Sequence, residues 1–253
     1  MKKTFKVVFI LGGLALAIPS FAQNENSYKL IPLPGKCYGI SPNGNWVIST
    51  ENTATAYLYD DSTGEVVNLL TTDITFCEAH AVGNDGTVVG IASGMPGYYK
   101  DGQWYILEMP KGYSEGQARH ISEDGSVIYG FVNQGFYYKP VVWRNNVIEY
   151  PEVPSRDLFN KIPQGGFMLF QATDNEEVMI GRMMDAEYAW YPMIWKDGKA
   201  DVMVRDLFID SAGKSTNAQV RSMSMSNNGK YVSLNILTSA SGNMSQDYSL
   251  YVY

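Results

Sequence analysis

The stretch HISEDGSVIYG, residues His120–Gly130, joins a Ser-x-Asp-Gly core to a β-branched and aromatic tail. Its histidine and two adjacent carboxylates make it a candidate for a catalytic cluster or a metal-binding loop. The alternative is a tight turn, because Asp-Gly supplies the positive φ angles of a type I′ hairpin and a preceding serine hydroxyl can bond the local backbone. Related stretches elsewhere in the chain decide between these interpretations.

A recognisable version of this stretch occurs five times. The copies are GISPNGNWVIS (residues 39–49), AVGNDGTVVG (81–90), HISEDGSVIYG (120–130), QATDNEEVMIG (171–181) and SMSNNGKYVSL (224–234). When Ser41, Gly83, Ser122, Thr173 and Ser226 are aligned, successive copies are 42, 39, 51 and 53 residues apart. Periods of this size are typical of propeller blades and other repeat arrays. The repetition therefore favours an architectural role for the turn over a catalytic one.

A second element, an aromatic residue leading into a polar turn, follows four of the copies. These elements are YDDSTG from Tyr59, YKDG from Tyr99, WRNN from Trp143 and WKDG from Trp195, and we expect the four aromatic side chains to pack between neighbouring repeats. Each repeat then consists of a strand, an Asx-Gly turn, a strand, a variable loop, an aromatic strand, a turn and a strand. Four short strands per period with tight turns predict an all-β propeller blade.

Two details of the repeat carry further expectations. A small residue ends the second strand in four copies, as Ser49, Gly90, Gly130 and Gly181, which suits a place where neighbouring backbone comes close. The fourth copy has Asn175-Glu176 where the others have Asx-Gly, and is the degenerate one.

The two ends of the chain suggest how the ring closes. The last copy stops at YSLYVY (residues 248–253), so it lacks a fourth strand, and YKLIPLP (residues 28–34) resembles the fourth strands of other repeats. We expect five four-stranded blades closed by pairing of the N- and C-terminal strands, which leaves no open edge. The rival interpretation is an open array, or one half of a longer architecture.

The repeats resemble two related families. GISPNGNWVISTENTATAYLYDDSTGEVVNL (residues 39–69) is similar to the TolB-type propeller repeat, in which Ser-Pro-Asp-Gly-Lys, a strand and a Tyr-x-x-Asp-x-x-Thr-Gly-Glu turn follow one another. AVGNDGTVVG with YYKDGQWYILEMP, and HISEDGSVIYG with KPVVWRNNVIEYP, resemble the extracellular HAF-type repeat. The resemblance implies a secreted β-propeller but little about activity, because a fold does not fix a function.

The N-terminus predicts export. MKKTFKVVFILGGLALAIPSFAQ has lysines, a short apolar run and small residues before a cut after Ala22, which is the pattern of a signal peptide over residues 1–22. We expect residues 23–253 to form one monomeric domain in the periplasm, at the cell surface or outside the cell, with no membrane span. Removing three lysines changes the formal charge from −7 to −10, which argues against nucleic acid or an anionic membrane as partner.

The two cysteines leave alternatives open. Export permits a disulfide between Cys37 and Cys77, and the other possibility is two free thiols. CEAH (residues 77–80) resembles half of a metal site, but the chain supplies no second half, so we expect neither a metal nor a cofactor.

Enzymatic interpretations find little support in the sequence. The Asp box of sialidases has a residue between Asp and Gly, whereas Asp124 and Gly125 are adjacent. Nucleophilic catalysis needs a base, and the only histidines are His80 and His120, predicted to lie on opposite faces of their strands. A glycosidase needs paired carboxylates, for which Glu78, Asp174 and Asp185 are the candidates near strand ends.

The variable loops are the better candidates for function. FVNQGFYYKP and RMMDAEYAWYP place extra rings between the second and third strands, and two insertions, residues 151–170 and 205–222, emerge on the same face. Function on rigid scaffolds concentrates in such loops. The candidate ligand-binding residues are Tyr137, Tyr188, Trp190, Arg182, His80 and His120.

Three functions follow from these patterns. The first is a binding or interaction module that holds a protein or glycan at the loop-rich face. The second is an extracellular carbohydrate-active hydrolase with carboxylates at the channel mouth, and the third is a purely structural envelope protein.

Overall fold

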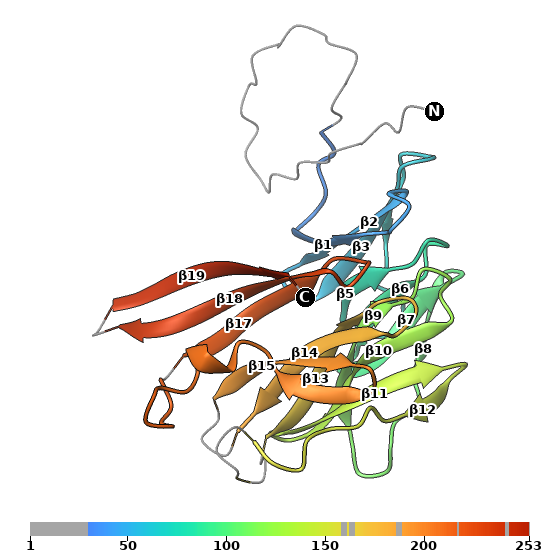
Figure 1. Cartoon of the computed structure of the whole chain (residues 1–253). Helices are drawn as coiled ribbons and strands as arrows, with labels where there is room; N and C mark the ends of the chain where they lie inside the picture. The colour runs from blue at the N-terminus through green and yellow to red at the C-terminus, as the bar shows by residue number, and fades with distance from the viewer. Residues whose placement is uncertain are drawn as a thin grey trace, which may run out of the picture.

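A computed structural model describes residues 30–157, 161, 165–185, 189–216, 218–240 and 243–252, which form an all-β fold (Figure 1). The predicted signal segment, residues 1–22, lies outside this range. The strands are β1 (Lys36–Ile40), β2 (Trp46–Glu51), β3 (Thr55–Asp60), β4 (Val66–Asn68), β5 (Cys77–Val82), β6 (Val88–Ala92), β7 (Met95–Lys100), β8 (Gln103–Ile106), β9 (Glu115–Ile121), β10 (Val127–Gln134), β11 (Tyr137–Arg144), β12 (Val147–Glu149), β13 (Gly166–Ala172), β14 (Val178–Met184), β15 (Trp190–Lys196), β16 (Lys199–Val202), β17 (Gln219–Met225), β18 (Tyr231–Ala240) and β19 (Asn243–Val252).

The strands form five consecutive antiparallel groups, β1–β4, β5–β8, β9–β12, β13–β16 and β17–β19. Within each group every strand pairs with the next in the chain, which confirms the strand order predicted for one repeat. A single parallel bridge between Tyr138 and Gly166 joins the third and fourth groups into one eight-stranded sheet. In Figure 1 the groups follow one another from β1–β3 at the top, through β5–β8 and β9–β16, to β17–β19 at the left.

The turn in the opening stretch is held by its own side chains. Ser122 Oγ donates to Asp124 Oδ1 (2.7 Å) and accepts from Val127 N (3.0 Å). The hydrogen bonds from Ser122 and then Ser126 lower the pKa of Asp124 to about 2. Asp124 is therefore a turn carboxylate that stays ionised, which is unsuitable for a catalytic acid.

The predicted type I′ geometry is wrong for this turn. Gly125 N donates to Ser122 O (3.0 Å), and only the glycine, with φ 75°, is left-handed. A longer loop of this kind needs one left-handed residue, which is why Asx-Gly also fits it. Two consecutive left-handed residues occur instead between third and fourth strands, at Asp101-Gly102, Asn145-Asn146 and Asp197-Gly198, and between second and third strands, at Asn52-Thr53 and Ser93-Gly94.

A β-bulge interrupts the inner strand of each group. In β9 the partner of Tyr129 is His120 and the partner of Gly130 is Ala118, so Arg119 is left without a partner. The residues in the same place in the first, second and fourth groups are Tyr38, His80 and Phe170, whereas β17 has its bulge at Arg221. A bulge re-aims side chains and bends the strand.

The glycine that ends the repeat lies across from this bulge. A Cβ on Gly130 would be 2.0 Å from Gln117 O, and one on Gly90 or Gly181 would meet a backbone oxygen at 1.8 or 1.9 Å. The expected close approach of backbone is confirmed for these three glycines. In the first copy the place is taken by Ser49, which is fully buried.

Three of the four repeated aromatic residues, Tyr99, Trp143 and Trp195, pack against the preceding group as expected, whereas Tyr59 packs on Ile31 and Leu33. Tyr59, Tyr99, Trp143 and Trp195 are all at most 9% exposed. Trp143 Nε1 donates to Glu108 O (2.8 Å) and Trp195 Nε1 to Glu152 O (2.6 Å), so each indole binds the segment that leaves the preceding group.

Glu176 gives the degenerate fourth copy a physical explanation. It occupies the place of the turn glycine, with φ 59°, and its amide donates to Thr173 O (2.9 Å). Its carboxylate accepts from Arg144 Nη2 (2.6 Å) and from the hydroxyl of buried Tyr129 (3.0 Å), both in the third group. An ion pair and a buried hydrogen bond between groups thus offset the cost of a non-glycine residue at positive φ.

The insertions are shorter than the sequence suggested. Residues 166–170 of the first already belong to β13, and residues 219–222 of the second belong to β17. A repeat pattern aligned on the turn does not show where the strand before it begins. The remainder of the second insertion contains a 3₁₀ turn, Arg205–Leu207.

The predicted closing strand is described only from Leu30 onwards. Ile31 and Leu33 are buried against Val47 and Tyr59 of the first group, and the described residues 30–34 form no strand. Within the described part of the chain, no helix is long and apolar enough to cross a membrane.

Candidate functional site: a central cavity

The inner strands of all five groups contribute residues that line one cavity of about 380 Å³. The side chain three residues before each aligned turn residue, here called position −3, lines it in every group: Tyr38, His80, Arg119, Phe170 and Met223. The next residue, position −2, lines it as well: Gly39, Ala81, His120, Gln171 and Ser224. Two neighbouring positions of a regular strand point to opposite faces, so the bulge is what allows both to reach the cavity in the first four groups.

The prediction that His80 and His120 lie on opposite faces of their strands is therefore wrong, because both residues line the same cavity. His80 Nδ1 lies 2.9 Å from Ala118 O of the next group, and its Nε2 lies 3.5 Å from Glu78 Oε2. His120 bonds the backbone of Ala172 in the group after its own. The histidines thus connect neighbouring inner strands.

Burial sets the charge of both histidines. It lowers the pKa of His120 to about 4, against the opposing effects of the Ala172 hydrogen bond and the charge of Asp174. Burial and the charge of Arg119 also lower the pKa of His80. Both rings are therefore neutral at pH 7, and neither contributes positive charge to the cavity.

The depressed pKa of His120 predicts a loss of stability in mild acid. Between pH 6.5 and pH 4 the unfolded chain takes up a proton that folded His120 does not, so the free energy of unfolding falls as the pH falls, by up to about 3 kcal/mol. The fourth copy has Gln171 at the same position, bonded to Met225 of the next group. We expect His120→Gln to fold and to show a weaker dependence of its urea midpoint on pH than the wild type. Equal slopes for the two proteins would contradict this.

Two arginines stack on a cavity-lining ring. Arg119 Cζ lies 5.2 Å and Arg182 Cζ 4.8 Å from the ring centre of Phe170. Arg182 Cζ also lies 4.7 Å from the ring centre of Trp190, which contacts Tyr138 edge to face at 5.6 Å. Cation–π contacts thus run from β15 to the cavity wall.

Burial makes the positive charge of these arginines costly. It lowers the pKa of Arg182 to about 10, with a further contribution from the charge of Arg119, and it also lowers the pKa of Arg119, which the charge of Glu78 partly restores. Arg182 Nε is buried and has no hydrogen-bond partner in the described part of the molecule.

The predicted site residues divide into three sets. His80 and His120 line the cavity, and Arg182 and Trp190 lie behind Phe170. Tyr137 is 48% exposed at the start of β11 and is not among the residues that line the cavity, and Tyr188 lies outside the described residues. Trp190 is partly covered by Arg182 and Tyr138, so less of its ring is open to a ligand than the sequence suggested.

The candidate catalytic carboxylates are not brought together in the cavity. Among its described lining residues there is no Asp or Glu. Asp185 is 3% exposed and accepts from Tyr191 OH (2.9 Å) and Ala189 N (2.9 Å). Asp174 and Glu123 line an adjoining space of about 20 Å³ beside the turns, which shares Pro42, His120, Ile121 and Asn227 with the cavity. Asp174 Oδ1 accepts there from Glu123 N (2.8 Å). That space holds about one water molecule, not a sugar.

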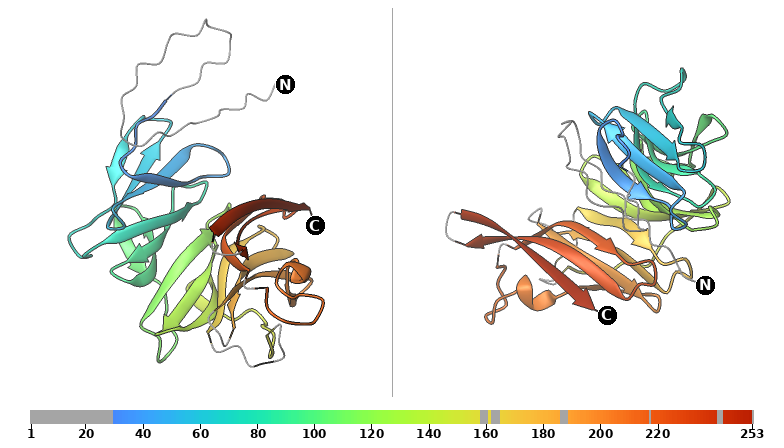
Figure 2. Two further views of the ribbon diagram at one scale, coloured as in Figure 1. Left: turned by 90° about the vertical axis from the view of Figure 1, so that its left-hand side faces the viewer. Right: turned by 90° about the horizontal axis from the view of Figure 1, so that it is seen from above.

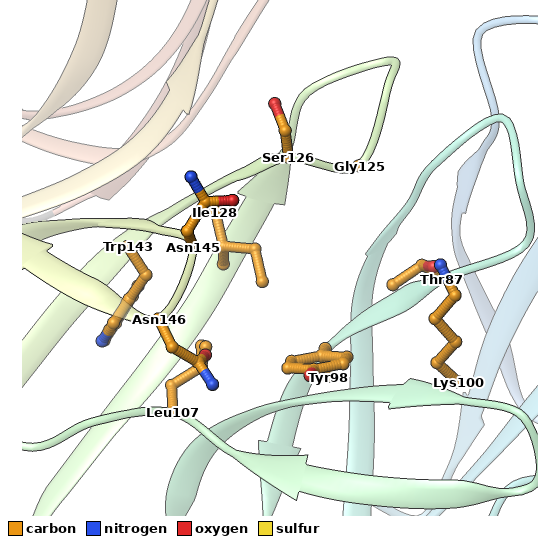
Figure 3. A pocket seen from close by; sticks show the side chains of 10 residues that line it. All are labelled: Thr87, Tyr98, Lys100, Leu107, Gly125, Ser126, Ile128, Trp143, Asn145 and Asn146. Atoms are coloured by element: carbon orange, nitrogen blue, oxygen red, sulfur yellow. The ribbon is translucent and has the colours of Figure 1, made fainter.

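A second hollow, of about 250 Å³, lies between the second and third groups (Figure 3). Tyr98 and Lys100 line one side, and Asn145 and Asn146 the other. Lys100 is engaged with Asp85 Oδ2 at 2.8 Å, and the Tyr98 ring stacks on Tyr105 at 4.9 Å. The hollow has polar walls, but its charged group is already paired.

Both cysteines are free thiols, with Cys37 exposed and Cys77 buried. Cys77 Sγ accepts from Ala56 N at 3.3 Å. No group of three or more metal-ligating side chains occurs among the residues that were placed.

Sequence reasoning missed Tyr38, Arg119, Phe170 and Met223. The signal was present as variation: positions −3 and −2 both hold different side chains in the five copies, whereas the turn motif after them recurs. Because strand and turn form with all of these side chains, the two positions are candidates for ligand contact.

Comparisons with known proteins support the fold alone. No family model matches the chain, and no curated protein matches it either. A structure of hydrazine synthase from Kuenenia stuttgartiensis is similar with a TM-score of 0.54 and 13% identity, over 91% of this chain and 66% of that one. A putative TolB from Agrobacterium tumefaciens is similar with a TM-score of 0.52 and 11% identity, over 82% and 78%. The chain thus spans about two thirds of the hydrazine synthase chain, and its fold is of the TolB-like propeller kind.

Proposed function

We propose that the chain is an exported, monomeric β-propeller of five blades that binds a protein or glycan partner at its central cavity and the loop-rich face. The observation that carries the proposal is the cavity wall, to which each repeat contributes one non-recurring side chain at position −3. A pocket of 300 to 1,000 Å³ is of the size that binds small molecules or a side chain of a partner. Closure of the ring through residues 28–34 is part of this proposal.

Binding is favoured over hydrolysis by the lining of the cavity. Glycoside hydrolysis requires two carboxyl groups about 5 to 9.5 Å apart in one cleft. The described residues of the cavity wall supply none, and Asp174 and Asp185 are engaged in holding turns and hairpins. The similarity to a TolB structure suggests interaction with proteins, although similarity at 11% identity carries no partner with it.

The loop-rich face carries exposed aromatic side chains. Phe136 is 75% exposed, and Tyr137 and Tyr150 are each 48% exposed. Tyr137 follows Phe136 at the tip between β10 and β11, and Tyr150 follows β12. Aromatic residues with an apolar body and a polar tip are typical of binding surfaces.

The proposal is tested with mature protein, residues 23–253, on a glycan array and in quantitative pull-downs from culture medium. Ser224→Trp fills the cavity from an exposed position, and Phe136→Ser with Tyr137→Ser alters the loop-rich face. We expect at least one of these changes to reduce recovery of the partner or glycan tenfold or more. Ser62→Trp, an equal substitution in an exposed turn of the first group, is the matched control. Unchanged recovery with both test variants would refute the proposal.

A further inference from the structure

We propose that Arg119, in the wall of the central cavity, binds the carboxylate group of an organic ligand, and that Arg182, stacked on Phe170 behind this wall, contributes its positive field. This inference deepens the proposed function. The existence of a natural ligand rests on that proposed function, whereas carboxylate binding can be tested separately with a simple carboxylate.

The geometry places two cations at one ring of the cavity wall. Both guanidinium carbons lie close to the Phe170 ring centre, so the sum of the two distances, about 10 Å, is the upper limit of their separation. Arg119 and Phe170 line the cavity directly, each at the bulge of its inner strand. A ligand in the cavity therefore meets Arg119 first and lies within the field of Arg182.

Most hydrogen-bond donors of both guanidinium groups are unused within the described residues. Each group carries five N–H donors. Arg119 Nη1 donates to Gln117 Oε1 (3.2 Å), and Arg182 Nη2 has only a weak contact with Met168 Sδ (3.6 Å). Arg182 Nε is buried without a partner. A buried charged donor left unpaired is costly, and a planar carboxylate matches the guanidinium fork.

The local balance of charge favours a single negative charge. In the described part of the chain no carboxylate lies within ion-pair distance of either arginine, although Arg119 feels the charge of Glu78, which contacts His80. Among the described residues, Glu78 is the carboxylate whose charge acts on the arginine pair, so the pair keeps one net positive charge; Asp174 acts on His120, and both histidines are neutral. A carboxylate neutralises this charge, whereas a doubly charged phosphate exceeds it in a protein that is already acidic.

The remainder of the wall suits an organic group. Phe170 and Tyr38 offer rings, and Met223 offers a flexible apolar side chain, all at position −3. Tyr38 is 49% exposed, so its ring is open to a ligand. An aromatic or sugar carboxylate can thus pack its body on these side chains while its charged group faces the arginines.

The experiment uses the mature protein with benzoate, at low ionic strength and pH 7, and calorimetry together with NMR of the arginine Nε–Hε signals. Benzamide, the neutral counterpart of benzoate, and inorganic phosphate are the comparison ligands. We expect benzoate to bind at least tenfold more tightly than either and to shift the Arg182 Nε–Hε signal.

Substitutions locate the site. Arg119→Gln and Arg182→Gln are each expected to weaken benzoate binding tenfold or more, and Arg119→Lys to restore part of it. Arg205→Gln is the matched control, because Arg205 is exposed and paired with Asp201 at 3.0 Å. If Arg182→Gln does not fold, benzoate binding by Arg119→Gln and the shift of the Arg182 Nε–Hε signal in the wild type still test the inference.

Three results would overturn the inference. They are equal binding of benzoate and benzamide, tighter binding of phosphate than of benzoate, and benzoate affinity unchanged in both Gln variants. Such a failure leaves the proposed function intact if Ser224→Trp still abolishes partner recovery. Conversely, if benzoate binding depends on Arg119, the inference stands even when no partner protein or glycan is found.

Discussion

Gly130→Ala is expected to lower the free energy of unfolding by about 3 kcal/mol or more. The new Cβ would lie 2.0 Å from Gln117 O and 3.1 Å from Ala118 Cα, and both are backbone atoms of the bulged strand β9. Because neither can rotate away, the bulge has to move. For a chain of this size we expect the thermal midpoint to fall by roughly 6 to 12 °C, measured by circular dichroism or calorimetry.

Gly39→Ala is the matched control for this change. Gly39 also lies in an inner strand, and its new Cβ would be in ordinary van der Waals contact with the side chain of Ile48 at 3.6 Å and with His80 O at 3.8 Å. We expect a change below about 1 kcal/mol. If the two alanine variants unfold at the same temperature, the close approach at the bulge is not what selects glycine.

Trp143→Ala is expected to cost about 3 to 5 kcal/mol. The indole is 1% exposed, packs in a core cluster with Ile128 and Val141, and donates through Nε1 to Glu108 O at 2.8 Å. Alanine leaves a cavity and also removes the hydrogen bond that joins the second group to the third. Urea denaturation followed by circular dichroism gives the free energy.

Trp143→Phe separates the two contributions. A six-membered aromatic ring is kept, while the N–H and the smaller ring of the indole are lost, so we expect a smaller cost of about 1 to 3 kcal/mol. A phenylalanine variant as unstable as the alanine variant would show that the hydrogen bond, not the packing, holds the groups together.

The strand order of each repeat was predictable because turn residues and periodicity are local properties. Asn43-Gly44 and Asp124-Gly125 mark the inner hairpins, and Trp143 and Trp195 mark the third strands. The close approach at Gly130 was predictable for the same reason, since a small residue recurs at one place. The turn type was not, because Asx-Gly satisfies both the type I′ loop and the longer loop found at Ser122–Gly125.

The cavity was harder to predict because it depends on one unpaired residue per strand. If side chains alternated strictly between the two faces of a strand, position −3 (His80) and position −2 (His120) would lie on opposite faces. A bulge between Ala79 and Ala81, or at Arg119, breaks this alternation without changing the turn motif. The contact of Arg182 with Phe170 joins residues from two strands whose register the sequence does not specify. Candidate residues chosen on loops, such as Tyr137, were therefore placed apart from the residues that surround the cavity.

The bulge also makes the binding chemistry of this chain modular. In the first four groups, backbone pairing at the bulge sets where the wall residue stands, opposite Ser49, Gly90, Gly130 or Gly181. Positions 38, 80, 119 and 170 thus share one backbone setting, and a library of variants randomised at these four positions would sample ligand specificities on one scaffold.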